Sequence, residues 1–103
     1  MNTISLEPWQ LGWREKVRRV LSPGEPAWLL KEQLGDYLGE PLVFLTMVSR
    51  WEGGWTRRTY TYDPVGDVLH YRGETPVSSA ERGKLKPEQL LQLRPQANEP
   101  SAP

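Results

Sequence analysis

The chain has 103 residues, which predicts a single domain with one modest hydrophobic core. Its 13 basic and 13 acidic residues cancel, which argues against a protein whose main role is to coat nucleic acid or anionic lipid. The absence of cysteine excludes disulfides, thiol catalysis and cysteine-ligated metals. No apolar run approaches the roughly 20 residues that span a bilayer, and the N-terminus does not resemble a signal peptide. We therefore expect a cytoplasmic protein without a membrane span.

A first helix is expected to begin at Pro8 and to continue to about residue 21. Its apolar face is formed by residues that recur every four positions: Trp9, Trp13 and Val17. Pro8 suits the first helical turn, where its missing N–H costs nothing. The opposite face is basic and carries Arg14, Lys16, Arg18 and Arg19. Gly12 weakens the helical pattern, and residues 15–21 also fit a strand.

A second helix is expected between Ser22 and Gly39. Ser22 and Glu25 have the spacing of a capping box, with Pro23 at the first helical position. The apolar residues of this segment would face inward: Trp28, Leu30, Leu34, Tyr37 and Leu38. Gly39 is a typical helix stop, and the proline at position 41 prevents continuation.

Three strands are expected to follow, over residues 42–51, 55–63 and 67–72, where β-branched and aromatic residues favour extended structure. Gly53 and Gly54 predict a two-residue hairpin loop, because both positions can take positive φ. Residues 64–66 predict a second turn with two open registers. A bulged turn sets His70 beside Tyr60, whereas a tighter turn, which we favour, aligns Leu69 and Tyr71 with Tyr62 and Tyr60.

The remaining residues complete the expected architecture. Residues 73–83 are expected to form a polar loop, residues 86–93 one or two helical turns, and the Pro-rich residues 95–103 a disordered tail. The sequence thus predicts one α+β domain, residues 1–94, with two N-terminal helices packed on one face of a three-stranded antiparallel β-meander and a short C-terminal helix. The alternative is a small all-β barrel in which residues 15–21 and 27–33 are strands.

The most informative segment is the expected hairpin tip, which concentrates the residue types enriched in protein interfaces: Arg50, Trp51, Trp55, Arg57 and Arg58. A loop at Gly53 and Gly54 would pair Arg50 with Arg57. Alternation then puts Arg50, Trp55 and Arg57 on the solvent face. The same alternation puts Trp51 and Arg58 on the core side, with Val43, Leu45, Met47, Tyr60 and Tyr62.

Two arginines directly opposite each other repel, so the expected pairing of Arg50 with Arg57 requires compensation. Glu52 and Trp55 on the same face would supply it, through charge and a cation–π contact. An anionic ligand or an acidic patch on a partner is the alternative source. The three solvent-facing residues are therefore the strongest candidates for a binding surface, and Trp51 is expected to anchor the fold.

Patterns typical of catalysis or metal binding are not found. His70 is the only histidine, so a histidine-rich metal site is excluded, and Asp63 and Asp67 lack the ligand spacing of a calcium or magnesium site. Neither a nucleophile elbow nor a glycine-rich phosphate loop occurs. We therefore expect a protein that is not an enzyme and uses no metal or cofactor. A deep pocket around His70, Asp63 or Asp67 would favour an enzyme instead.

Residues 60–69, with the sequence YTYDPVGDVL, resemble one unit of the YD repeats of Rhs-type shell proteins. Such repeats act in many copies, and this chain has one copy over about a tenth of its length. The hairpin chemistry of the segment accounts for the similarity, so the resemblance implies no function.

Two functions are consistent with these features. The first is a non-enzymatic binding or accessory protein that docks a protein partner through the Arg/Trp-rich hairpin. The second is a weak nucleic-acid-binding module that uses the hairpin together with the basic face of the first helix, Arg14, Arg18 and Arg19. A steep loss of affinity with salt would favour the second.

Overall fold

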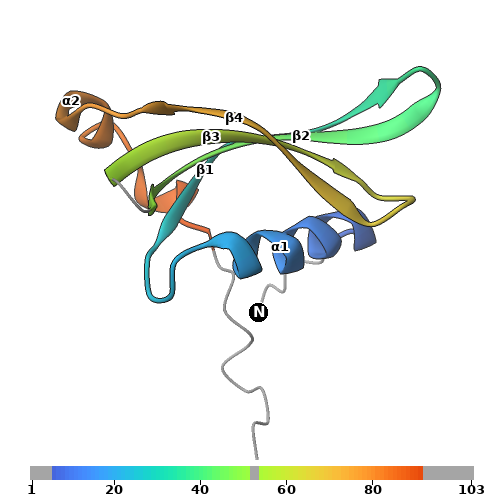
Figure 1. The fold of residues 1–103 in the computed structure, drawn as a ribbon, viewed down its shortest axis with the longest axis horizontal. Coiled ribbons are helices and arrows are strands. Elements are labelled where there is room, and N and C mark those ends of the chain that lie inside the picture. Colours follow the sequence, from blue (N-terminus) through green and yellow to red (C-terminus); the bar gives the residue numbers. More distant parts are fainter. Residues whose placement is uncertain (1–5, 52–53, 92–103) are drawn as a thin grey trace, which may run out of the picture.

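The computed structural model describes residues 6–51 and 54–91 and shows an α+β fold. One main helix, α1 (Pro8–Val20), lies along one face of an antiparallel sheet (Figure 1). The sheet has the strand order β1-β2-β3-β4, with β1 at Ala27–Tyr37, β2 at Glu40–Trp51, β3 at Gly54–Asp63 and β4 at Val68–Pro76. Two short elements follow, α2 (Ser79–Arg82) and the 3-10 turn η1 (Pro87–Gln89). Within the described residues, no helix has the length and apolar character needed to cross a membrane.

The first helix confirms the prediction from its apolar stripe. Pro8 occupies the first turn, and the Gln10 side chain accepts a hydrogen bond from the backbone N–H of Glu7 at 2.8 Å. Trp13 and Val17 are fully buried on the face that meets the sheet. The helix ends at Val20, after which the chain is extended.

The predicted second helix is wrong, because residues 27–37 form the edge strand β1. The apparent helical spacing came from Leu30, Leu34 and Leu38, which are all exposed in the structure. Leu30 lies at a bulge in the pairing of β1 with β2, where it has no partner. Pairing along nearly the whole length of β2 satisfies the backbone of this segment and overrides its local helical pattern. The all-β alternative is wrong for residues 15–21, because residues 15–20 belong to α1, but its strand over residues 27–33 is confirmed as part of β1.

The β2–β3 hairpin has a register two residues away from the predicted one. Trp51 pairs with Gly54 and Arg50 with Trp55, so the expected pairing of Arg50 with Arg57 is wrong. Residues 52 and 53, which connect the strands, lie outside the described residues. A shift of two preserves the alternation of faces, and the expected core side is confirmed. The observed register sets buried Leu45 beside Tyr60 and Val43 beside Tyr62, and this packing outweighs the turn preference of the glycine pair.

The β3–β4 hairpin has the register favoured from the sequence, with Leu69 opposite Tyr62 and Tyr71 opposite Tyr60. The rings of Tyr60 and Tyr71 meet edge to face with centroids 5.8 Å apart. Residues 73–76 extend β4 and pair with β3, so the loop predicted from residue 73 is wrong at its start. The register shifts beside Gly73, whose φ of +148° allows the bulge.

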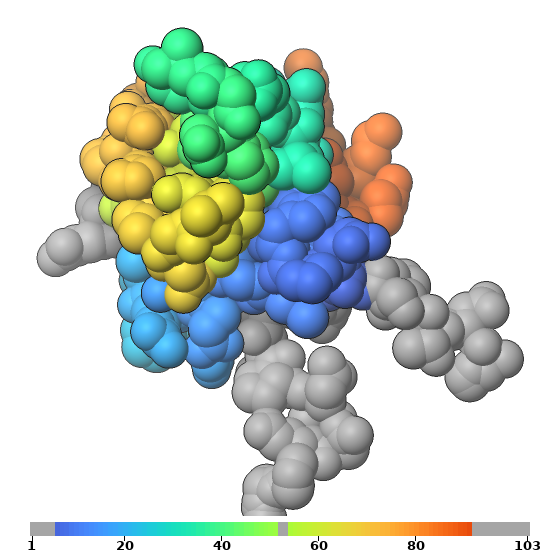
Figure 2. Space-filling model, turned by 90° about the vertical axis from the view of Figure 1, so that its right-hand side faces the viewer, coloured from blue at the N-terminus to red at the C-terminus, as the bar shows by residue number. Residues whose placement is uncertain are grey.

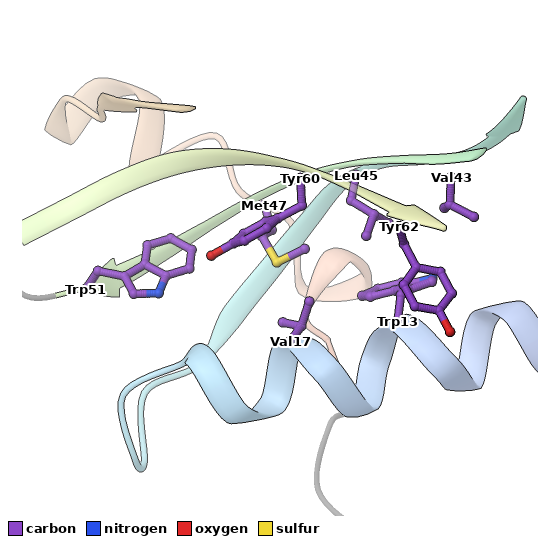
Figure 3. Packing of buried hydrophobic residues seen from close by; sticks show 8 residues of the cluster. All are labelled: Trp13, Val17, Val43, Leu45, Met47, Trp51, Tyr60 and Tyr62. Atoms are coloured by element: carbon purple, nitrogen blue, oxygen red, sulfur yellow. The ribbon is translucent and has the colours of Figure 1, made fainter. Parts of the chain in front are cut away.

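The hydrophobic core lies between α1 and the sheet, as Figure 3 shows. Trp13 and Val17 point up from α1 toward a layer of side chains from the two central strands, namely Val43, Leu45, Met47, Tyr60 and Tyr62. Trp51 closes this layer at one end. Because α1 covers only this face, the other face of the sheet is left for α2 and for solvent.

The segment after β4 first contacts β3 and then returns to β1. The backbone N–H of Val77 donates to Trp55 at 3.0 Å, and that of Leu91 donates to Ala27 at 2.8 Å. The helical turns expected over residues 86–93 are present in part, as η1. The residues predicted to form a disordered tail, 95–103, lie outside the described part of the chain.

Candidate functional site

We call the sheet face turned away from α1 the open face. One row of side chains crosses all four strands on this face near α2, and a second row crosses nearer the β1–β2 turn. The first row is Trp28, Val48, Arg57 and Thr75, and the second is Gln33, Phe44, Thr61 and His70. The two rows define two regions of the open face with different chemistry.

Trp55 lies on the open face, as alternation predicts, and packs against Trp28. Their ring centroids are 5.7 Å apart and the rings are tilted by 48°. The guanidinium of Arg82 from α2 lies over the Trp55 ring at 5.2 Å. Val48 is nearly inaccessible beneath this region. Trp28 was expected inside a helical core, and its place on the open face follows from β1 being a strand.

Arg50 and Arg57 flank Trp55 and each has an acidic neighbour within the chain. Arg50 Nε lies 3.7 Å from a Glu25 oxygen, and Arg57 Nη1 lies 3.2 Å from a Glu81 oxygen. Hydrogen bonds from the Ser78 backbone N–H and from Arg57 lower the pKa of Glu81. Because Arg50 does not lie opposite Arg57, the compensation expected from Glu52 is not needed, and each arginine has its own glutamate. Glu52 lies outside the described residues. Exposed pairs of this kind contribute little to stability, so exchange for a partner's carboxylate costs little.

Trp51 and Arg58 lie on the helix-facing side of the sheet. Trp51 is buried in the core, and the Arg58 guanidinium stacks on its ring at 4.2 Å. Arg58 Nε donates to Glu74 at 2.9 Å and its Nη1 donates to the Tyr60 hydroxyl at 3.0 Å. Partial burial opposes the charge of Arg58, but these two bonds outweigh it and raise its pKa. Both residues thus stabilise the fold, and neither contributes to the open face.

The basic face of α1 is neutralised by acids within the chain. Arg18 and Arg19 both lie near Glu15, at 2.6 and 3.4 Å, and the bond from Arg18 lowers the pKa of that carboxyl. Arg14 stacks on Trp13 and approaches Glu32 to 3.9 Å. Because α1 packs on the sheet face that carries Leu45 and Tyr60, and Trp55 lies on the other face, the structure does not bring the two parts of the predicted basic surface together.

A groove of about 650 Å³ lies at the far end of the open face, between the β1–β2 and β3–β4 turns. Figure 2 shows this end of the molecule, with the green β1–β2 turn above the yellow β3–β4 segment. The side chains that define its chemistry are Tyr37, Phe44, Thr61, His70 and Arg72. Sequence reasoning missed the groove because residues 37 and 44 meet only when β1 is a strand. The one signal in the sequence was that His70 and Arg72 are two residues apart in the last predicted strand, where alternation sets them on the same face as Thr61 of the neighbouring strand.

His70 and Asp63 line this groove, as an enzyme would require, but Asp67 does not. His70 is exposed and, among the described residues, has no ion pair with a carboxylate. Asp63 accepts the backbone N–H of Val65 at 2.9 Å, which fixes it in the β3–β4 turn. The described residues contain no group of three histidine, aspartate or glutamate side chains that could hold a metal ion.

A hydrogen-bonded network joins α1 to the β3–β4 turn. The Tyr62 hydroxyl donates to Asp67 at 2.6 Å, and Lys16 Nζ lies 3.2 Å from the other Asp67 oxygen. Burial and the bond to Asp67 raise the pKa of Tyr62 to about 12. The bonds from Tyr62 and Lys16 in turn lower the pKa of Asp67.

The Tyr62→Phe variant is expected to lose less stability than the wild type when the pH is raised into the alkaline range. An unfolded tyrosine ionises near pH 10, whereas Tyr62 stays neutral up to a pKa of about 12. The stability from Tyr62 is therefore complete below about pH 10 and falls as the pH rises toward the folded pKa. Urea unfolding of wild type and variant, at pH values of about 9 and about 11, measures the difference. Tyr37→Phe, at an exposed tyrosine, is the control; equal alkaline losses in wild type and Tyr62→Phe would contradict the expectation.

Comparison of the chain with protein-family models, with curated proteins and with solved structures gave no match. The site must therefore be interpreted from its own geometry.

Proposed function

We propose that the chain is a small, non-enzymatic, cytoplasmic binding or accessory protein that docks a protein partner through the open face. The contact is centred on Trp55, with Arg50 and Arg57 beside it. The observation that carries the proposal is the Trp28–Trp55 pair, flanked by three arginines on a face that α1 leaves uncovered. Tryptophan and arginine are the residue types most enriched at interface hot spots.

The arrangement of these side chains also favours binding. Trp55 is held between Trp28 and Arg82, so little side-chain freedom is left to lose when a partner binds. The arginines around it favour a partner surface that combines carboxylates with an apolar centre. Trp51 and Arg58, which were also candidates for the surface, support this face from below through the core.

Weak nucleic-acid binding is the second candidate, because Arg82 stacked on Trp55 resembles the aromatic and cationic contacts of single-strand binders. It has less support, since the arginines of α1 lie across the sheet and are paired with acids. Salt dependence separates the two candidates. Each phosphate contact makes the affinity fall more steeply with salt, whereas a protein interface of mixed chemistry responds weakly.

The test is the Trp55→Ala, Arg57→Ala variant, used with wild type to capture partners from native cell extract. A captured protein is purified and its affinity measured for both forms. Loss of a hot-spot tryptophan is expected to weaken binding by roughly 30-fold, which corresponds to about 2 kcal/mol. Arg19→Ala is the control, because Arg19 is exposed on the opposite side of the sheet. Identical captured material and equal affinity for the double variant, with its fold intact, would overturn the proposal.

A further inference from the structure

Arg72 is fixed on the open face, and within residues 6–51 and 54–91 no carboxylate forms an ion pair with its guanidinium. Its Nε donates to Thr61 Oγ1 at 2.9 Å, and Thr61 is only 6% exposed. Arg72 directly precedes Gly73 at the bulge of β4, and bulges commonly redirect a side chain beside a binding site. Because Nε is satisfied by a buried hydroxyl, the two terminal nitrogens remain available for both oxygens of one carboxylate.

The charge of Arg72 is not balanced within the described part of the chain. Eight arginines lie there, and six of them have a carboxylate within 4.0 Å: Arg14, Arg18, Arg19, Arg50, Arg57 and Arg58. The other two are Arg72 and Arg82, and the second covers Trp55. Two carboxylates, those of Asp63 and Glu40, line the same groove, but among the described residues neither forms an ion pair with Arg72, and Asp63 is held in the turn by the Val65 N–H. Arg72 is thus the groove's unpaired cation among the described residues.

Apolar side chains complete the groove around this cation. The ring of Phe44 forms part of its floor, and Tyr37 at its edge is 61% exposed. Leu38 follows in the β1–β2 turn with a φ of +53° and 85% exposure. A leucine is strained in this left-handed conformation and gains no burial there, a combination more typical of a contact site than of a turn selected for stability. The volume of about 650 Å³ falls within the range of small-molecule sites.

We propose that this groove binds a small aromatic carboxylic acid. The carboxylate lies on the terminal nitrogens of Arg72, and the aromatic body lies against Phe44 and Tyr37. The guanidinium of Arg72 favours a ligand that carries a carboxylate, and the side chains of Phe44 and Tyr37 favour a ligand with an aromatic ring. This site lies at the other end of the open face from Trp55, so it stands independently of the proposed protein contact.

The experiment titrates the full, isotope-labelled chain with phenylacetate and follows the amide and arginine Nε–H resonances. Saturable shifts are expected at Phe44, Thr61 and Arg72. Phenylacetamide has the same ring without the charge, and its binding is expected to be weaker by about tenfold or more. Equal binding of acid and amide, or the absence of a saturable shift in the groove, would overturn the proposal without any variant being needed.

Two variants localise the effect. Arg72→Gln is expected to weaken phenylacetate binding by about tenfold or more, whereas Arg19→Gln on α1 leaves it unchanged. Thr61→Val removes the hydroxyl that holds Nε, and a smaller loss is expected. Undiminished binding by a folded Arg72→Gln variant would contradict the site. The last ligand to be titrated is a short peptide with phenylalanine at its C-terminus. If this peptide binds about tenfold more tightly than phenylacetate, the groove binds the C-terminus of a polypeptide and the proposal is wrong.

Discussion

Replacing Trp13 with alanine is expected to lower the free energy of unfolding by about 3–5 kcal/mol. The side chain is fully buried between α1 and the sheet, in the cluster that contains Val17 and Leu45. Truncation would leave a large cavity and would remove the indole N–H that donates to Glu32 at 3.0 Å. Since small domains are stable by only about 5–15 kcal/mol, this loss is a large share of the total. Urea titration followed by circular dichroism measures it.

Two variants of the same helix control for this result. Leu11→Ala, at an exposed position two residues before Trp13, is expected to change the stability by no more than about 0.5 kcal/mol. Trp13→Phe retains most of the apolar area but loses the donor to Glu32, so an intermediate loss is expected. If Trp13→Ala were no more damaging than Leu11→Ala, α1 would not be held to the sheet through this residue.

Glu32 shows how the helix is oriented on the sheet. It lies on the helix-facing side of β1, opposite Leu45, and accepts hydrogen bonds from Trp13 and from Gln10 at 3.2 Å. A carboxylate bonded to donors on α1 fixes the position of the helix more specifically than apolar packing does. An inward-pointing charge on an edge strand also discourages pairing with another chain.

The same residue explains why the sequence predicted a helix where β1 lies. In the period-two pattern of a strand, Leu29 and Leu34 lie on the helix-facing side of β1, although Leu34 is exposed near the end of the strand. Glu32 occupies the helix-facing position between them, close to a bulge at Leu30. The bulge and the inward carboxylate break the alternation that would have indicated a strand. What remained was the spacing of exposed leucines at helical intervals. By contrast, α1, β2 and β3 follow unbroken patterns, and their prediction was correct in type.

The candidate surface was predictable to the extent that it depends on alternation alone. The predicted register of β2 and β3 was wrong by two residues, which left Trp55 and Arg57 on the correct face. The same error paired Arg50 with Arg57, a pairing that the structure does not contain. The partners of these residues, Glu81 and Trp28, come from segments whose structure was predicted as loop and helix. The groove at Arg72 needs residues from all four strands, and the sequence analysis predicted β1 as a helix, so the groove was missed.

Gly12→Ala is expected to destabilise the protein by about 1–3 kcal/mol, although alanine is the better helix former by about 1 kcal/mol. A Cβ at this position would overlap the Tyr62 hydroxyl oxygen and would lie 2.9 Å from the ring carbon that carries it. Neither contact is tolerated, so α1 or the tyrosine would have to move. Movement of the tyrosine would break its 2.6 Å bond to Asp67. Thermal unfolding of wild type and variant measures the difference.

Whether Gly12→Ala raises or lowers the stability distinguishes two reasons for a glycine at this position. If Gly12 were only a weak helix position, alanine would stabilise the protein in every background. If it is needed for the close approach of α1 to β3, its cost should fall in a Tyr62→Phe background, where the nearest clashing atom is absent. The ring carbon at 2.9 Å remains, so part of the cost should persist. A double-mutant cycle over the two positions should therefore give a coupling energy of about 0.5–3 kcal/mol, as expected for residues in contact. Additive effects, or a more stable Gly12→Ala protein, would show that α1 does not lie this close to Tyr62.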